Sequence, residues 1–348
     1  VLTDPDGSTI VDLIENFSNQ GEDLSYGRKL TGSIAFLEPT PGKINETQSY
    51  EGWLPSASFS NSRGFYENSF NLALKHNDPD AEIWFSKDGR SRMSLYEEPF
   101  VISGNTSVKV EVRKSGFKSP PSQTHTYLFI EDTLQYSNMN QGELGKAQNM
   151  EKARKGLIDL PTINVSVDQL PDDWNERPAS VEIFLPGEEP IFENAGVERF
   201  GGAWTNFGKK NYRLKFRAKY GAKKLKAPLF DCFDLGFQVV DQFDELDLRA
   251  GGHDMSSRGF YMSSRFSEDS MLEMGSLNPH GRFVNLYFNG NYWGQYHMRE
   301  RLTDAFLADY LGGKTADYTN VRGNDNNGSS FILGTPDPIN REPWANVL

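Results

Sequence analysis

Residues 281–298 constrain the fold of this chain most tightly. Two runs rich in aromatic residues, Phe283–Phe288 and Tyr292–Met298, lie on either side of the pair Asn289-Gly290. An Asn-Gly pair between two strand-like runs is a strong signal for a hairpin with a type I′ turn, because both residues of the pair tolerate positive φ. The sequence therefore predicts an antiparallel pair of strands in this region.

The rest of the chain is also predicted to be rich in strands and turns. It contains 32 glycines and 18 prolines among 348 residues, which favours turns over long helices. At about 150 residues per domain the length indicates two or three domains. Hydrophobic residues make up 37% of the chain, which excludes wholesale disorder. The elements predicted in the second half are strands at 160–167, 179–185 and 243–249 and helices at 258–275 and 302–311.

Charge and cysteine content exclude several classes of function. The net charge of −12 argues against general nucleic-acid binding, which needs clustered lysine and arginine. The single cysteine, Cys232, rules out an intramolecular disulfide and a cysteine-based zinc site, and the five histidines show no HExxH spacing. No apolar run reaches the roughly 18 residues that a membrane-spanning helix needs. We therefore expect no nucleic acid, no membrane span and no metal-ligating set in this chain.

Residues 199–226 reverse the sign of the overall charge. The alternation of Tyr212, Leu214 and Phe216 with basic residues predicts a strand with one apolar and one cationic face. One interpretation is that these lysines and the glycines just upstream hold the phosphates of a nucleotide. The other, favoured by spacing alone, is a solvated cationic face on an edge strand. The basic residues are Arg199, Lys209, Lys210, Arg213, Lys215, Arg217, Lys219, Lys223, Lys224 and Lys226.

Three ordered motifs in the second half resemble the family of spore coat protein H (CotH) kinases. They are KKNYRLKFRAKYGAKKLKAPLF, LDLRAGGHD and YFNGNYWGQYHMRERLTDAFLADYLGG. The resemblance covers roughly residues 158–348 and implies an α+β, atypical protein-kinase-like fold that binds ATP with Mg or Mn. It also implies transfer of phosphate to serine or threonine of secreted or coat proteins. A secreted or cell-surface protein is therefore expected.

The resemblance also implies roles for particular residues. Lys209 or Lys210 would contact the phosphates, with Lys215 as the alternative, and the hinge would lie at His297 to Glu300. The helix at 258–275 would brace the small lobe. In this family the catalytic aspartates lie in the C-terminal lobe, beyond the position that corresponds to Leu348. The resemblance therefore predicts a fragment that is truncated at its C-terminus, contains no catalytic residue and is inactive by itself.

The first half resembles two β-sandwich modules. Residues 1–48 are similar to the C-terminal part of a lamin-tail domain, through the turn DPDG and the segments DLSYGR and PTPGKIN. Residues 51–130 are similar to the Ig-like module at the C-terminus of chitobiase and β-hexosaminidases, through FSNSRGFYENSFNLAL and AEIWFSKDG. The polar segment 131–157 is predicted to be a linker with a short helix around Glu151 to Lys155. We expect the remaining residues, 158–348, to form the CotH kinase-like domain.

Two other functions stay open at this point. The kinase-like domain of the parent protein could be a non-catalytic extracellular surface or adhesion scaffold. Alternatively, the Ig-like module could contact carbohydrate and make the chain an accessory module of a carbohydrate-active protein. Extracellular or surface proteins are the expected phosphate acceptors if the parent is a kinase.

Overall fold

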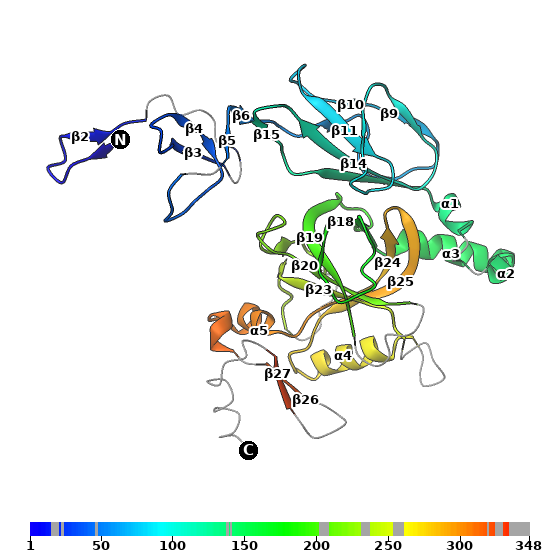
Figure 1. Cartoon of the computed structure of the whole chain (residues 1–348). Helices are drawn as coiled ribbons and strands as arrows, with labels where there is room; N and C mark the ends of the chain where they lie inside the picture. Colours follow the sequence, from blue (N-terminus) through cyan, green and yellow to red (C-terminus); the bar gives the residue numbers. More distant parts are fainter. Residues whose placement is uncertain are drawn as a thin grey trace.

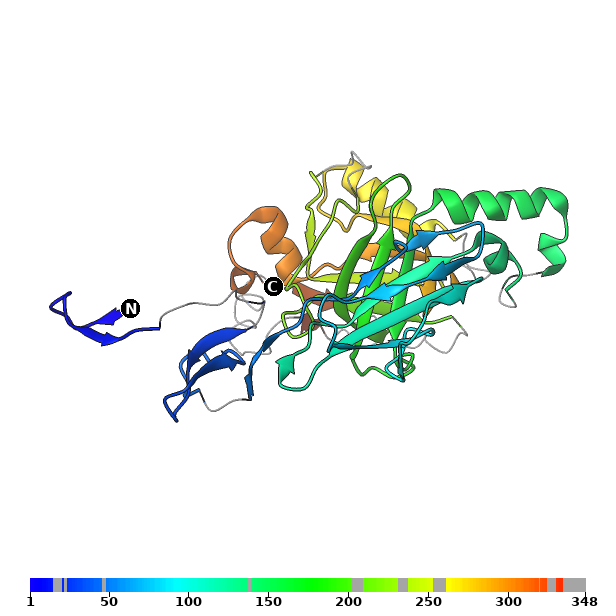
Figure 2. The ribbon, with the colours of Figure 1, turned by 90° about the horizontal axis from the view of Figure 1, so that it is seen from above.

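The computed structural model shows three main regions, a short N-terminal arm, a β module and a barrel. Figures 1 and 2 show the β module lying against the barrel, with the arm extending away from both. The residues that the structure describes are 1–14, 21, 24–45, 48–136, 139, 141–201, 209–230, 237–252, 261–318, 320–323 and 330–333.

The N-terminal arm consists of two small separate sheets. One pairs two strands that leave Ile10 and Val11 more than half exposed, and the other has three strands with Phe36 and Leu37 buried. Little apolar surface is therefore buried within residues 1–14. The strands are β1 (Leu2–Thr3), β2 (Ile10–Asp12), β3 (Ser25–Arg28), β4 (Ile34–Leu37) and β5 (Ser49–Tyr50).

The β module has a five-stranded sheet in the order β12-β11-β14-β16-β8, accompanied by shorter strand pairs. Val108, Val110 and Val112 alternate along β14 and are buried, as the period of two requires. They belong to a core of residues 54–129 that contains no barrel residue. The strands are β6 (Gly52–Trp53), β7 (Ser58–Phe59), β8 (Gly64–Phe65), β9 (Phe70–Leu72), β10 (Leu74–Lys75), β11 (Glu82–Ser86), β12 (Ser94–Leu95), β13 (Phe100–Ile102), β14 (Thr106–Arg113), β15 (Phe117–Lys118) and β16 (Gln123–Leu128).

The segment predicted as a linker is helical and packed. It contains α1 (Ile130–Leu134), α2 (Gln141–Leu144) and α3 (Ala147–Asp159). Leu134, Leu144 and Leu157 are buried in a small cluster that also includes Phe184 and Tyr287 of the barrel. These few leucines dock the helices against the barrel. The sequence did not indicate this packing, because most residues around the leucines are polar.

The second half forms a closed seven-stranded barrel in the order β17-β18-β19-β20-β23-β25-β24. All neighbours are antiparallel except β17 and β24, whose parallel pairing closes the barrel and sets Val165 beside Phe288. Leu214, Leu248 and Met298 are fully buried in the barrel core. The strands are β17 (Thr162–Val167), β18 (Arg177–Phe184), β19 (Ile191–Phe200), β20 (Asn211–Lys215), β23 (Glu245–Arg249), β24 (Gly281–Phe288) and β25 (Asn291–Glu300).

The predicted hairpin and the helix after it are confirmed. Asn289 and Gly290 have φ of 50° and 77°, as a type I′ turn requires, and they join β24 to β25. The helix α5 spans Asp304–Leu311, and the hydroxyl of Thr303 accepts a hydrogen bond from the Phe306 amide as its N-cap.

The remaining elements surround the barrel. Helix α4 is shorter than the predicted 258–275, and residues 253–260 lie outside the described part of the chain. None of the helices that the structure describes is long and apolar enough to cross a membrane. The elements are β21 (Leu225–Lys226), β22 (Gln242–Phe243), α4 (Ser263–Glu273), the 3₁₀ turn η2 (Thr315–Asp317), β26 (Asn320–Gly323) and β27 (Ser330–Leu333).

A buried carboxylate joins the β module to the barrel. Glu182 of β18 is fully buried and accepts hydrogen bonds from the Thr126 amide at 2.9 Å and the Asn164 side chain at 3.1 Å. Arg63 of the β module lies 3.4 Å from the carboxylate. Burial raises the pKa of Glu182, while Arg63 and these hydrogen-bond donors oppose that shift. The two regions are therefore held together by a polar cluster whose members depend on each other.

We predict that Glu182→Ala lowers the free energy of unfolding by about 3–5 kcal/mol, because the Arg63 guanidinium is left buried without its carboxylate. Urea unfolding followed by circular dichroism measures this change. Replacing Arg63 and Glu182 together by leucine should recover much of the loss. The control Glu189→Ala removes an exposed carboxylate just after the same strand. If Glu182→Ala and Glu189→Ala lower the free energy of unfolding equally, Glu182 does not hold the two regions together.

Candidate functional site

The lysine-bearing strand β20 is an interior strand of the barrel. It pairs with β19 on one side and β23 on the other, so that Tyr212 lies opposite both Arg199 and Leu248. The interpretation of this segment as a cationic edge strand is therefore wrong. The alternation itself is confirmed, because Tyr212 and Leu214 point into the barrel core and the basic residues between them point outward.

Lys215 is neutralised by carboxylates on the outer face of the barrel. Its ammonium lies 2.7 Å from Glu198 and 3.3 Å from Glu176, and all three side chains are largely buried. Its neighbour Arg213 is bound in the same way, at 2.7 Å from Asp247. An ammonium that is already paired with carboxylates gains little from binding a phosphate, so Lys215 has a structural role here.

Lys209 is in a different environment, next to the predicted hairpin. Its ammonium donates a hydrogen bond to the carbonyl of Gln295 on β25. It also lies 4.4 Å from the ring centre of Tyr296 and 5.7 Å from that of Tyr261, within range of cation–π attraction. Within the described ranges no carboxylate comes within ion-pair distance of it.

Burial without a counter-charge changes the acidity of this amine. Removal from water lowers the pKa of Lys209 to about 8, because desolvation disfavours the charged form. Near neutral pH the group therefore still carries its proton, but it does so in a poorly solvated position. An anionic ligand would relieve that cost, whereas the same ligand would gain little from Lys215.

A glycine on β25 makes room for the Lys209 side chain. Gly294 has φ of 122°, a conformation that other residues rarely adopt, and a Cβ placed there would lie 3.3 Å from Cε of Lys209. The strand sequence around it gave no reason to expect this approach. The sequence therefore did not identify three residues of this site, Gly294, Tyr261 and Tyr296. They are far from Lys209 in the chain, and nothing in their spacing indicates that they contact it.

Lys210 lies at the same end of the barrel as Lys209. Its carbonyl accepts a hydrogen bond from the Tyr296 hydroxyl at 2.9 Å, which fixes the backbone just before β20. The glycine-containing loop 202–208, which the phosphate-binding interpretation invoked, lies outside the described residues.

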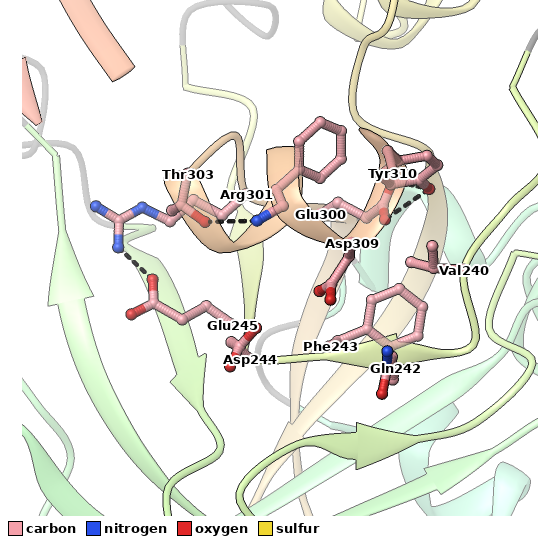
Figure 3. A pocket seen from close by; sticks show the side chains of 11 residues that line it. Val240, Gln242, Phe243, Asp244, Glu245, Glu300, Arg301, Thr303, Asp309 and Tyr310 are labelled. Atoms are coloured by element: carbon pink, nitrogen blue, oxygen red, sulfur yellow. Dashed lines mark hydrogen bonds and ion pairs between the residues drawn. The ribbon is translucent and has the colours of Figure 1, made fainter. Parts of the chain in front are cut away.

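Glu300 is held by internal partners beside a small pocket. Its carboxylate accepts hydrogen bonds from the His280 amide at 2.8 Å and from the Tyr310 hydroxyl at 2.9 Å. Figure 3 shows Glu300 and Tyr310 facing each other at the pocket wall, with Asp309 nearby. Glu300 is buried, and its contacts attach α5 to the end of β25.

The structure does not bring the four predicted residues together. Lys209 contacts β25 at Gln295, whereas Glu300 is five positions further along the strand, about 16 Å away at 3.3 Å per residue. Lys215 is at the Glu300 end, because β20, β23 and β25 pair there in register. The candidate site is therefore the Lys209 end alone, formed by Lys209, Lys210, Tyr261, Gly294, Gln295 and Tyr296.

In the part of the chain that the structure describes, no metal site accompanies these residues. Among the residues described by the structure, no three His, Cys, Asp or Glu side chains are placed to hold a metal ion together. The Mg or Mn expected from the resemblance thus has no ligand set in the described part of the chain, and we assign no residue to it.

We predict opposite stability effects for two lysine variants. Lys209→Met should raise the free energy of unfolding at pH 7 by about 1–3 kcal/mol, because a poorly solvated charge is removed. The unfolded chain binds more protons than the folded chain between pH 8 and 10.5, so wild-type stability gains from rising pH in this window and the advantage of the variant shrinks.

Lys215→Met is the matched control and should lower stability by about 1–2 kcal/mol, because Glu176 and Glu198 lose a partner. Denaturant unfolding at pH 7 and pH 9.5 measures both variants. If Lys209→Met destabilises the protein as much as Lys215→Met does, Lys209 has a structural role and the argument for an anion site fails.

Comparison with known proteins agrees with the CotH resemblance over part of the chain. Residues 197–344 match the family model described as CotH kinase protein. The match begins near the end of β19 and covers β20, β23, both strands of the hairpin and α5. No curated protein matches the chain. Residues 197–344 are thus similar to the CotH family, and this stretch includes all the residues of the candidate site.

Proposed function

We propose that the CotH domain of this chain binds a nucleoside triphosphate at the Lys209 end of the barrel. In the protein to which it belongs, the domain transfers the terminal phosphoryl group of ATP to serine or threonine hydroxyls of secreted or surface proteins. The observation that carries this proposal is the partly buried ammonium of Lys209, which contacts Gln295, Tyr261 and Tyr296 and has no carboxylate partner among the described residues.

The chemistry of Lys209 suits a phosphate. A lysine ammonium is a compact charge with three donors, and among the described residues Lys209 makes one hydrogen bond with it, to the Gln295 carbonyl. Hydrogen bonds between an ammonium and a phosphate oxygen are charge-assisted and gain strength where water is scarce. A nucleotide phosphate would therefore restore the solvation that burial removes.

The surrounding residues would position this amine. The rings of Tyr261 and Tyr296 flank Lys209 and limit the access of water. The Tyr296 hydroxyl binds the Lys210 carbonyl and so fixes the chain where it enters β20. Gly294 allows the side chain to lie close against β25. We name no catalytic base, because no described carboxylate lies near Lys209.

One observation favours a second function, a non-catalytic surface scaffold. Lys215 and Glu300, two of the four residues predicted for the nucleotide site, are bound to internal partners. A domain of this kind would use its barrel for structure alone. The two functions differ in whether the chain binds nucleotide.

We predict that the chain binds a fluorescent ATP analogue in the presence of magnesium and that Lys209→Met weakens binding about tenfold or more, as expected for the loss of a charge-assisted contact. Fluorescence titration measures the affinity. Lys215→Met should bind as wild type does, since that ammonium is already paired. Equal affinity of wild type and Lys209→Met, or no binding by a folded wild type, would contradict the proposal and favour the scaffold.

A further inference from the structure

A large apolar groove lies between the β module and the barrel. It has a volume of about 840 Å³ and is far from Lys209 in the chain, being built from residues 64–67, 129–131, 154–160 and 184–190. Phe129, Phe184 and Leu185 are buried, whereas Phe65 and Ile158 are 42% and 55% exposed. Large apolar side chains left open in a concave surface are typical of a binding site.

The groove is not a gap left by loose packing between the β module and the barrel. Phe65 and Phe184 meet edge to face across it, with ring centres 5.9 Å apart. The buried cluster of Glu182 and Arg63 joins the same two regions. The groove is therefore a fixed feature of the assembled chain.

An open sheet edge runs along one wall of the groove. Strand β8 is the last strand of the five-stranded sheet, and among the described strands it pairs with β16 alone. The Tyr66 amide donates to the Leu128 carbonyl and so faces β16. Strand β8 comprises Gly64–Phe65, and because backbone groups of successive residues in a strand point to opposite sides, those of Phe65 point away from β16. At Phe65 this edge can form backbone hydrogen bonds with an extended peptide.

Acidic side chains surround the groove. Glu67 and Glu188 are exposed at its rim, and neither forms an ion pair with any described residue. The third rim carboxylate, Glu131, and the rim cation Arg154 are paired with each other at 2.8 Å. The net potential at the rim is therefore negative, and it favours a ligand that carries positive charge beside its apolar part.

We propose that this groove binds an extended peptide whose apolar side chains are flanked by lysine or arginine. The peptide adds as a strand to β8, places its apolar side chains against Phe65 and Ile158, and sets its basic residues near Glu67 and Glu188. An open edge, an apolar floor and an unpaired acidic rim together specify this ligand. The site is separate from the nucleotide site and does not rest on it.

The probe is a fluorescein-labelled peptide, KLVIVK, titrated into the full chain and followed by anisotropy. We expect saturable binding that is about tenfold weaker for the charge-reversed peptide ELVIVE. N-methylation of alternate backbone amides in KLVIVK should abolish binding, because the strand can no longer pair. Equal binding of all three peptides would show non-specific apolar adsorption and overturn the proposal.

Variants locate the binding to this groove. Ile158→Asp should weaken KLVIVK binding about tenfold, while Val101→Asp, which changes a similarly exposed residue (59%) on β13, should not change it. Glu188→Lys should weaken binding and Glu98→Lys should not. All four positions are exposed, so each variant is expected to fold. Equal effects of Ile158→Asp and Val101→Asp, or a groove-dependent dimer seen by light scattering, would overturn the proposal.

Discussion

The parallel ladder between β17 and β24 closes the barrel whose strands β20 and β25 carry the candidate site. It joins Thr162 to Asn285 and Val165 to Phe288, two segments more than 120 residues apart in the chain. Within the barrel β20 has no free edge, because it pairs with β19 and β23, and its basic residues therefore lie between carboxylates from neighbouring strands. Strand β23 pairs with both β20 and β25 and so holds β25 near the start of β20, where Lys209 meets Gln295. The strands β17 and β18 precede the region that matches the CotH family, yet the barrel needs both.

Charge pairing then separates the lysines into two kinds. Lys215, with Glu176 and Glu198 beside it, stabilises the outer face of the barrel, whereas Lys209 is partly buried against aromatic rings with no described carboxylate within ion-pair distance. The distinction is energetic, because a paired charge is already stabilised and an unpaired one gains from a ligand. The same reasoning applies at the module interface, where Glu182 is stable only because Arg63 and its hydrogen-bond donors surround it.

The sequence predicted the local elements better than their partners. The hairpin at 281–300 and helix α5 follow from Asn289-Gly290, the aromatic runs and Gly312, all of which act over a few residues. The alternation of β20 was also visible. Its position inside a closed barrel was not, because strand order depends on long-range pairing that leaves no local signature. The choice between Lys209 and Lys215 was equally hidden, since it depends on Glu176, which is 39 positions before Lys215. The resemblance of the first half to lamin-tail and Ig-like modules stays a prediction.

The account is tested most directly by the reactivity of individual lysines with and without ATP. Limited acetylation of the intact chain at pH 8, read by mass spectrometry, gives a separate modification rate for each lysine. The account predicts that ATP with magnesium slows the modification of Lys209 and leaves that of Lys215 unchanged. An unchanged rate at Lys209 under saturating ATP, or protection confined to lysines outside the candidate site, would contradict the assignment of the nucleotide site to this end of the barrel.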